Sequence, residues 1–78
     1  MLKIISIEPK ENFMLFVRLS NGKEGLFDVS PYLDKGIFGE LKNTGYFKLA
    51  RISFSGISWP NCQDFSADTI EYEMKPID

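Results

Sequence analysis

The dipeptide Asn21-Gly22 constrains this chain most, because it follows an alternating apolar stretch and marks a β-hairpin. Phe13, Leu15, Val17 and Leu19 occupy every second position before it, a period that is typical of a strand. Asn-Gly favours a two-residue type I′ turn, because these residues tolerate the positive φ angles that such a turn needs. The sequence therefore predicts an antiparallel hairpin around Asn21-Gly22.

A two-residue loop sets the register of this hairpin. It places Val17 opposite Leu26 and Phe16 opposite Phe27, so apolar residues meet on both faces. This arrangement favours a sheet that is covered on both sides.

A second hairpin is expected between Arg51 and Trp59, with Ser55-Gly56 at its turn. The predicted pairs are Phe54 with Ile57, Ser53 with Ser58 and Ile52 with Trp59. One face of this hairpin then becomes apolar and the other polar, which supports the register.

Short helices are expected between and after the hairpins. Ser30 and Pro31 resemble an N-cap followed by the first helical residue, and Gly36 ends that turn. Asn43 and Ser66 are expected to cap two further helices. Ile37, Phe38 and Leu41 form an apolar patch at helical spacing, as do Ile70 and Met74 near the end of the sequence.

These elements predict a single α+β domain over residues 1–78. It has a small, mostly antiparallel sheet of about five strands, formed by two hairpins and an N-terminal strand, with short helices. At 78 residues the core is small, and one cysteine allows no intramolecular disulfide. Seven Phe, three Tyr and one Trp exceed what such a core encloses easily, so we expect a protein partner or a homo-oligomer.

The charges are unevenly distributed. Residues 1–51 hold eight basic and six acidic side chains, whereas residues 52–78 hold one basic and five acidic ones. The basic residues are scattered, which disfavours nucleic-acid binding by the isolated chain. The alternative is a nucleic-acid-binding regulator whose oligomer aligns four basic side chains, those of Lys3, Lys10, Arg18 and Lys23.

Catalytic, cofactor-binding and metal-binding residues are not expected. The chain has no histidine, and Cys62 has no basic neighbour in sequence that would lower its thiol pKa. The scattered aspartates match no calcium loop and are explained more simply by turns and helix caps. An enzyme that uses a carboxylate pair or a small-ligand pocket is a distant third alternative.

The residues with a possible role in interaction lie in the last third of the chain. Trp59 has two interpretations, a core residue next to the strand-ending Pro60 or a hot spot at the rim of an interface. Asn61 and Asp64 are expected to stabilise the following turn through backbone amides, with ligand binding as the alternative. The remaining candidates are three acidic residues that would steer a basic partner, namely Asp68, Glu71 and Glu73.

The order of these motifs resembles the family catalogued as domain of unknown function 2442. The resemblance rests on Asn21-Gly22, Phe27-Asp28, a Phe-x-x-Leu element, Phe47, and a Gly-x-x-Trp-Pro-Asn segment from Gly56 to Asn61 that leads to Asp64. The closing run Ser66-Ala67-Asp68 with Ile70 and Tyr72 is also similar.

The resemblance implies a prokaryotic α+β domain without known catalytic residues. Genes of relatives often stand beside the gene of another small protein, an arrangement similar to that of toxin–antitoxin pairs. Some relatives continue into a helix-turn-helix domain, for which this sequence offers no residues. We therefore expect a non-enzymatic protein-interaction module, the antitoxin-like or regulatory half of a two-gene unit. The short N-terminal apolar run and the lone cysteine favour a cytoplasmic protein without a membrane span.

Overall fold

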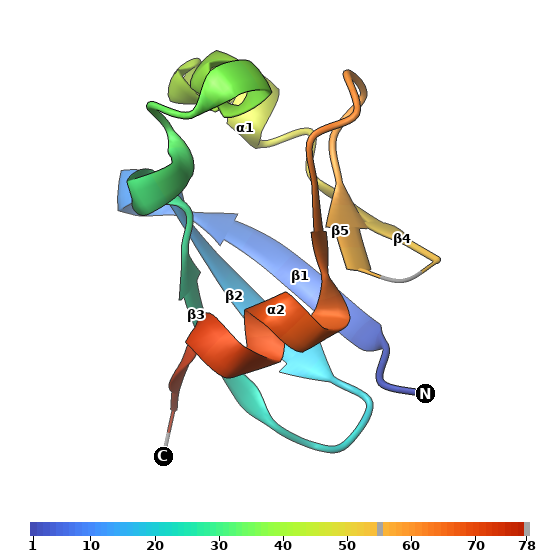
Figure 1. Ribbon diagram of the computed structural model, residues 1–78. Helices are drawn as coiled ribbons and strands as arrows, with labels where there is room; N and C mark the ends of the chain where they lie inside the picture. Colours follow the sequence, from blue (N-terminus) through green and yellow to red (C-terminus); the bar gives the residue numbers. More distant parts are fainter. Residues whose placement is uncertain (55, 78) are drawn as a thin grey trace.

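The computed structural model describes residues 1–54 and 56–77, which form two antiparallel sheets and several short helices around one core (Figure 1). The large sheet has the order β1-β2-β3-β7, with β1 (Ile4–Lys10), β2 (Met14–Leu19), β3 (Glu24–Asp28) and β7 (Lys75–Pro76). The small sheet has the order β4-β5-β6, with β4 (Arg51–Ser53), β5 (Gly56–Ser58) and β6 (Asp64–Ser66).

The helical segments are short. There are two α-helices, α1 (Thr44–Phe47) and α2 (Ala67–Glu73). There are also three 3₁₀ segments, η1 (Glu11–Phe13), η2 (Ser30–Tyr32) and η3 (Gly36–Lys42). Helix α2 lies across the large sheet, while η3 and α1 gather at one end of the molecule (Figure 1). The α+β class with antiparallel pairing is confirmed, and β6 and β7 are strands that the sequence did not predict.

The first hairpin forms around Asn21-Gly22, but its predicted register is wrong by one residue. Phe16 pairs with Leu26 and Leu15 with Phe27, and the Leu19 amide donates to the Lys23 carbonyl. The loop therefore has three residues. A two-residue type I′ turn would need positive φ at both Asn21 and Gly22, but only Gly22 has one, +90°. A three-residue hairpin loop of this kind ends in a residue with left-handed backbone geometry. Each residue of β2 therefore faces a different residue of β3 from the one expected.

The connection between β1 and β2 also differs from the expectation. Phe13 was expected on the strand, but it belongs to η1, where Asn12 and Phe13 have φ angles of +61° and +59°. Positive φ is uncommon for a bulky residue and is held here by surrounding contacts. The carbonyl of Phe13 accepts from the Val29 amide at 2.9 Å, and its ring packs edge-on against Phe47.

The second hairpin is present, but its predicted register is wrong by two residues. Ile52 pairs with Ile57, and Ser53 pairs with Gly56, so Gly56 lies inside β5 rather than in the turn. Ser55, the other predicted turn residue, lies outside the described residues. A Cβ atom on Gly56 would lie 1.9 Å from the Phe65 carbonyl oxygen, so the close approach of β5 and β6 requires this glycine.

The helix caps agree with the sequence in two of three cases. The side chains of Asn43 and Ser66 accept from the amides of Tyr46 and Thr69, as predicted. Ser30 does not cap its turn. Instead the carboxylate of Asp28 accepts from both the amide and the hydroxyl of Ser30, because an aspartate two residues earlier closes a local turn more readily.

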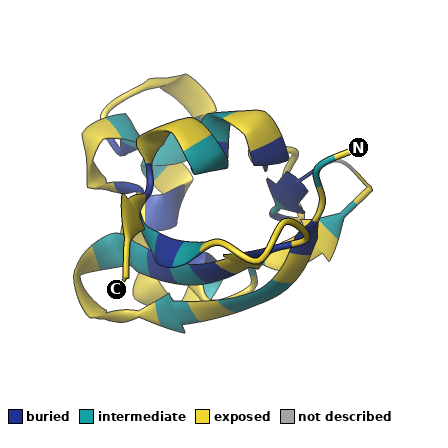
Figure 2. Cartoon of the chain, turned by 90° about the horizontal axis from the view of Figure 1, so that it is seen from below, coloured by how far each residue is buried: buried dark blue, intermediate teal, exposed yellow. Residues whose placement is uncertain are grey.

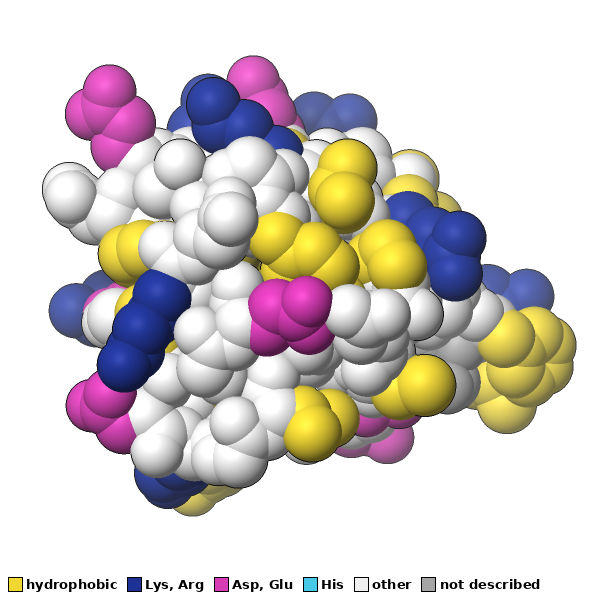
Figure 3. Space-filling view, turned by 90° about the horizontal axis from the view of Figure 1, so that it is seen from above, with side chains coloured by type: hydrophobic (Ala, Val, Ile, Leu, Met, Phe, Trp, Pro, Cys, Tyr) yellow, Lys and Arg dark blue, Asp and Glu magenta, His cyan; other side chains and the backbone are white. Residues whose placement is uncertain are grey.

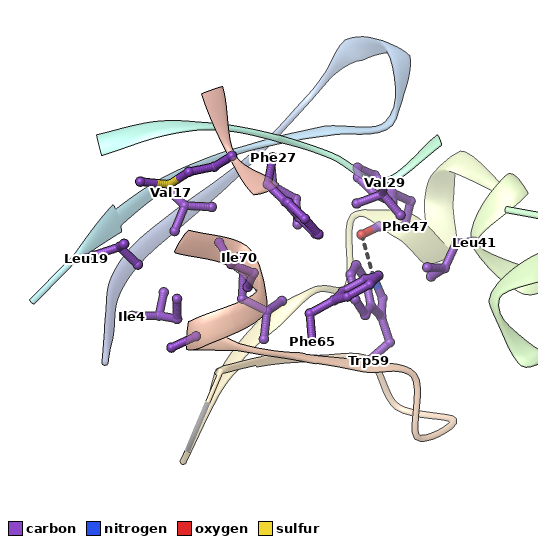
Figure 4. Packing of buried hydrophobic residues seen from close by; sticks show 14 of the residues in the cluster. Ile4, Val17, Leu19, Phe27, Val29, Leu41, Phe47, Trp59, Phe65 and Ile70 are labelled. Atoms are coloured by element: carbon purple, nitrogen blue, oxygen red, sulfur yellow. Dashed lines mark hydrogen bonds between the residues drawn. The ribbon is translucent and has the colours of Figure 1, made fainter. Parts of the chain in front are cut away.

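The core lies between the large sheet, α2 and the small sheet. Figure 2 shows buried residues where these elements face one another. Phe27 and Trp59 both pack edge-on against Phe65, with ring centroids 4.9 Å and 6.0 Å from it (Figure 4). Ile70 of α2 and Met74, which directly follows the helix, complete the core, as the sequence predicted.

Candidate interaction site

Trp59 is a core residue. Its side chain is only 1% exposed, and its indole N–H donates to the Phe47 carbonyl at 2.9 Å (Figure 4). The core interpretation of Trp59 therefore applies, and its side chain offers no surface to a partner. The Gly-x-x-Trp-Pro-Asn segment fixes the packing of β5 against α1 rather than forming a rim.

Asn61 stabilises the turn after Trp59, but not through the backbone amides that the sequence suggested. Its side-chain amide donates to the Glu40 carboxylate at 2.8 and 2.9 Å, and its backbone N–H donates to the Tyr46 hydroxyl. Asp64 is exposed at the start of β6. These two predicted residues therefore do not converge on one site.

Gln63 was not predicted, yet it is the polar centre of this turn. It is 1% exposed, donates to the Ile37 carbonyl and to Glu40, and accepts from the Tyr46 hydroxyl. Among the described residues, no buried side-chain nitrogen or oxygen lacks a partner. Because these polar groups are paired within the chain, the turn has a structural role.

The three acidic residues of α2 differ in their surroundings. Glu71 accepts from the Asn21 amide at 2.7 Å and lies 3.5 Å from the Lys23 ammonium. Glu73 accepts from the Tyr32 hydroxyl at 2.6 Å. Asp68 is exposed in the first turn, so it and Glu73 keep most of the uncompensated charge on this helix.

The acidity of the Tyr32 hydroxyl is shifted by its surroundings. Its hydrogen bond to the Glu73 carboxylate favours the neutral phenol, and burial adds to the effect, so the pKa of Tyr32 is raised. The ring of Tyr32 also packs against Phe65. The hydrogen bond to Glu73 ties η2 to the C-terminal end of α2, and the ring contact ties it to β6.

The basic residues of the nucleic-acid alternative are mostly neutralised. Lys10 lies 3.2 Å from Glu8, Arg18 contacts Glu24, and Lys23 contacts Glu71. Paired carboxylates reduce the positive potential that phosphate binding requires. The described residues hold no cluster of three or more metal-ligating side chains, and Cys62 is exposed.

The outer face of the large sheet is different from all of these places. Its register brings Phe16 and Leu26 into a direct cross-strand pair, with Met14 beside Phe16 on the same face. All three side chains are partly exposed. Figure 2 shows α2 on one side of the large sheet and no helix on the other. We call this apolar surface, made of Met14, Phe16 and Leu26 with Ile77 beside them, the outer face.

An open groove runs along the outer face. Its volume is about 1140 Å³, and Met14, Phe16, Leu26 and Ile77 give it an apolar floor. Phe13 and Phe47 also line it, and their two rings pack edge-on with centroids 5.6 Å apart. The charged residues around the groove are Glu8, Lys10, Glu11 and Lys48. An apolar centre within a charged rim is the usual composition of a protein-binding surface.

Exposed apolar side chains also occur elsewhere among the described residues, where Ile5, Ile37, Leu49 and Ile52 are 44–58% exposed. The face that carries η3 and α1 shows hydrophobic side chains, some of them next to one another, among charged and polar ones (Figure 3). Phe54 and Tyr72 are strongly exposed, at 83% and 90%, but they belong to separate elements. Scattered apolar residues are normal on protein surfaces, whereas a grouped set in a groove needs an explanation.

The sequence contained the signal for the outer face without identifying it as a site. Met14 and Phe16 fall on the even-numbered face of β2, which the sequence interpretation expected to be covered. The described chain covers only the other face. Within residues 1–54 and 56–77, no helix has the length and apolar character that crossing a membrane requires.

The comparisons with known proteins identify a family and do not assign an activity. No curated protein and no solved structure matches the chain. Residues 4–76 match the model of the family described as "Protein of unknown function (DUF2442)". This match agrees with the motif order from Asn21-Gly22 to Asp64 and covers nearly the whole sequence, so the chain belongs to the DUF2442 family.

Proposed function

We propose that this domain is a non-enzymatic protein-interaction module that binds through the outer face of the large sheet. The observation that carries the proposal is the open groove of about 1140 Å³, whose floor is formed by Phe16, Leu26, Met14 and Ile77. Covering such a surface removes apolar area from water and contributes roughly 25 cal/mol per Å² before the costs of association. The surface of a partner protein is large enough to cover this apolar floor.

The polar features of the domain support the same proposal. The side chains of Glu40, Asn61 and Gln63 form hydrogen bonds with one another or with Tyr46. These hydrogen bonds stabilise the fold. Their atoms are occupied by structural contacts rather than directed at a substrate. The apolar outer face is therefore the better candidate for function.

In this proposal the domain is the regulatory, antitoxin-like half of a small two-protein unit. The acidic surface of α2, with Asp68 and Glu73, steers a basic partner toward the domain. Neutralising Asp68, Glu71 and Glu73 together is expected to slow association with that partner at low salt, and the difference is expected to shrink at high salt. An unchanged association rate at low salt would remove the steering role but not the outer-face role.

Photochemical cross-linking inside the host cell tests the proposal. A photoreactive phenylalanine analogue replaces Phe16, and the same analogue at Tyr72, which is 90% exposed on α2, serves as the matched position. We expect position 16 to give a discrete protein adduct that resists nuclease treatment. An adduct that nuclease removes would support the nucleic-acid alternative, and no protein adduct at position 16 would refute the proposal.

A further inference from the structure

We infer that the protein seated on the outer face is a second copy of this chain, packed face to face about a two-fold axis. The inference rests on the proposed function, because it names the occupant of the same surface. It follows from the register of the large sheet, which arranges the exposed side chains in rows, two of which complement themselves.

The edges of the large sheet do not offer a route to a dimer. On one edge, β1 carries a register irregularity after Ile4 and also contains Pro9, which has no N–H to donate. On the other edge, β7 has two residues, one of which is Pro76. Both features discourage a second copy from extending the sheet. The outer face remains as the surface on which sheets can pack.

The exposed side chains of the outer face form three rows across the strands. The middle row runs from Glu8 through Phe16 and Leu26 to Lys75, because each is the direct partner of the next. One row beside it contains Ser6, Arg18 and Glu24, and the row on the other side contains Lys10, Met14 and Asp28.

A two-fold axis parallel to the strands, between β2 and β3, matches these rows with themselves. It places β2 of one copy over β3 of the other, and β1 over β7. In the middle row Phe16 then lies over Leu26 of the second copy, and Glu8 lies over its Lys75. In the next row Arg18 lies over Glu24 of the second copy, and in the remaining row Met14 lies over Asp28 of the second copy. The symmetry repeats each contact, so the interface has two of every pair.

The charge count of the outer face agrees with this arrangement. Three acidic residues, Glu8, Glu24 and Asp28, balance three basic ones, Lys10, Arg18 and Lys75. The surface is therefore formally neutral around an apolar centre, and a second copy meets no net repulsion. A partner with a strong charge of one sign would gain no such match here. The balance favours self-association on this face.

The dimer leaves the rest of the molecule accessible. Helix α2 packs on the opposite face of the large sheet, as Figure 2 shows, so both copies of α2 point away from the interface. Asp68 and Tyr72 then remain exposed on the two outer sides. A dimer of this kind presents its acidic helices twice, which increases the avidity for a partner with two sites.

Charge reversal at one pair tests this geometry. Arg18→Glu places like charges over one another in its own dimer, because residue 18 faces residue 24 of the second copy, and Glu24→Arg does the same. Each variant alone is expected to dimerise at least about tenfold more weakly than the natural protein. Mixed in equal amounts, they place opposite charges over one another, so the heterodimer is expected to form.

The mixing step isolates contacts between chains. Arg18 and Glu24 also contact each other within one chain, but mixing leaves those internal contacts unchanged. Circular dichroism checks that each variant is folded, and Tyr72→Ser, on the opposite side of the large sheet, controls for unrelated surface effects. Sedimentation equilibrium distinguishes the 8.9 kDa monomer from a particle of twice that mass.

Four outcomes bear on the inference and on the proposed function, separately or together. A natural protein that stays monomeric up to millimolar concentration, or variants that do not associate on mixing, would overturn the dimer. If position 16 still cross-links to a different protein, the interaction function stands and its occupant is another chain. If position 16 cross-links to nothing, both ideas fail. An adduct of twice the chain mass together with association on mixing supports both.

Discussion

The indole of Trp59 and the carbonyl of Phe47 are joined by a buried hydrogen bond of 2.9 Å, although the two residues lie on different elements. The bond fixes α1 against the end of β5, and Phe47 in turn lines the groove. The most recognisable motif of the sequence is thus the support of the candidate site. It holds the groove in shape from inside the core.

Replacing Trp59 with Phe is expected to destabilise the domain by about 2–4 kcal/mol. The substitution leaves the Phe47 carbonyl without its donor and removes volume from the core. Urea denaturation followed by far-ultraviolet circular dichroism measures the change. Tyr72→Phe, at a site that is 90% exposed, is the control and should change the free energy of unfolding by less than about 0.5 kcal/mol.

Replacing Gln63 with Leu is expected to cost about 2 kcal/mol. The shape is similar, but the Ile37 carbonyl loses its donor and the Tyr46 hydroxyl loses its acceptor. Asn61→Ala removes an exposed hydrogen bond from the same network and should cost less than about 1 kcal/mol. Thermal unfolding of the two variants side by side decides the matter, and equal losses would contradict the central position assigned to Gln63.

Gly56→Ala is expected to unfold much of the protein. The new Cβ would lie 1.9 Å from the Phe65 carbonyl oxygen. The atoms nearest to it belong to the backbone of β6, which cannot shift without breaking the strand pairing. We expect a loss of more than about 3 kcal/mol, which is a large part of the stability of a small domain. Gly39→Ala is the matched control, because its Cβ would meet its nearest atom at an ordinary 3.6 Å. Similar stability of the two variants would show that β5 and β6 are further apart.

The free energy of unfolding is expected to depend on the ionisation of Tyr32 at alkaline pH. Its pKa is raised in the folded protein by the bond to Glu73, so the unfolded chain loses this proton first as the pH rises. The stabilisation is complete below the ordinary phenol pKa of about 10 and is lost above it, as the pH passes through the raised value. Tyr32→Phe should cost about 1 kcal/mol at neutral pH, and the difference from the natural protein should shrink above pH of about 10. A difference that stays constant up to the highest pH would contradict the role of Glu73.

The local features of the fold could be predicted from the sequence because short-range chemistry determines them. Asn43 and Ser66 cap their helices through their own side chains, and Ile70 and Met74 show the period of α2. Asn21-Gly22 marks its turn correctly. In each case the residues that decide the structure lie within a few positions of one another.

The registers and the site could not be predicted in the same way, because distant contacts decide them. Gly56 enters β5 because β6 approaches it closely, and the sequence around Ser55 gives no sign of that neighbour. The three-residue loop before Lys23 shifts the partner of Phe16 from Phe27 to Leu26. Only with this register do apolar and charged residues form the rows of the outer face.

Oxidation of the methionines tests most directly whether the outer face is a binding surface. The chain supplies its own controls, because Met1 is 90% exposed, Met74 is 6% exposed in the core, and Met14 forms part of the groove floor. Peroxide treatment of the dilute purified protein and of the protein in an extract of its host, followed by mass spectrometry, gives the oxidation rate at each site. We predict that Met14 oxidises several-fold more slowly in the extract, relative to Met1, while Met74 stays protected in both. Equal relative rates for Met14 in the two samples would contradict the account.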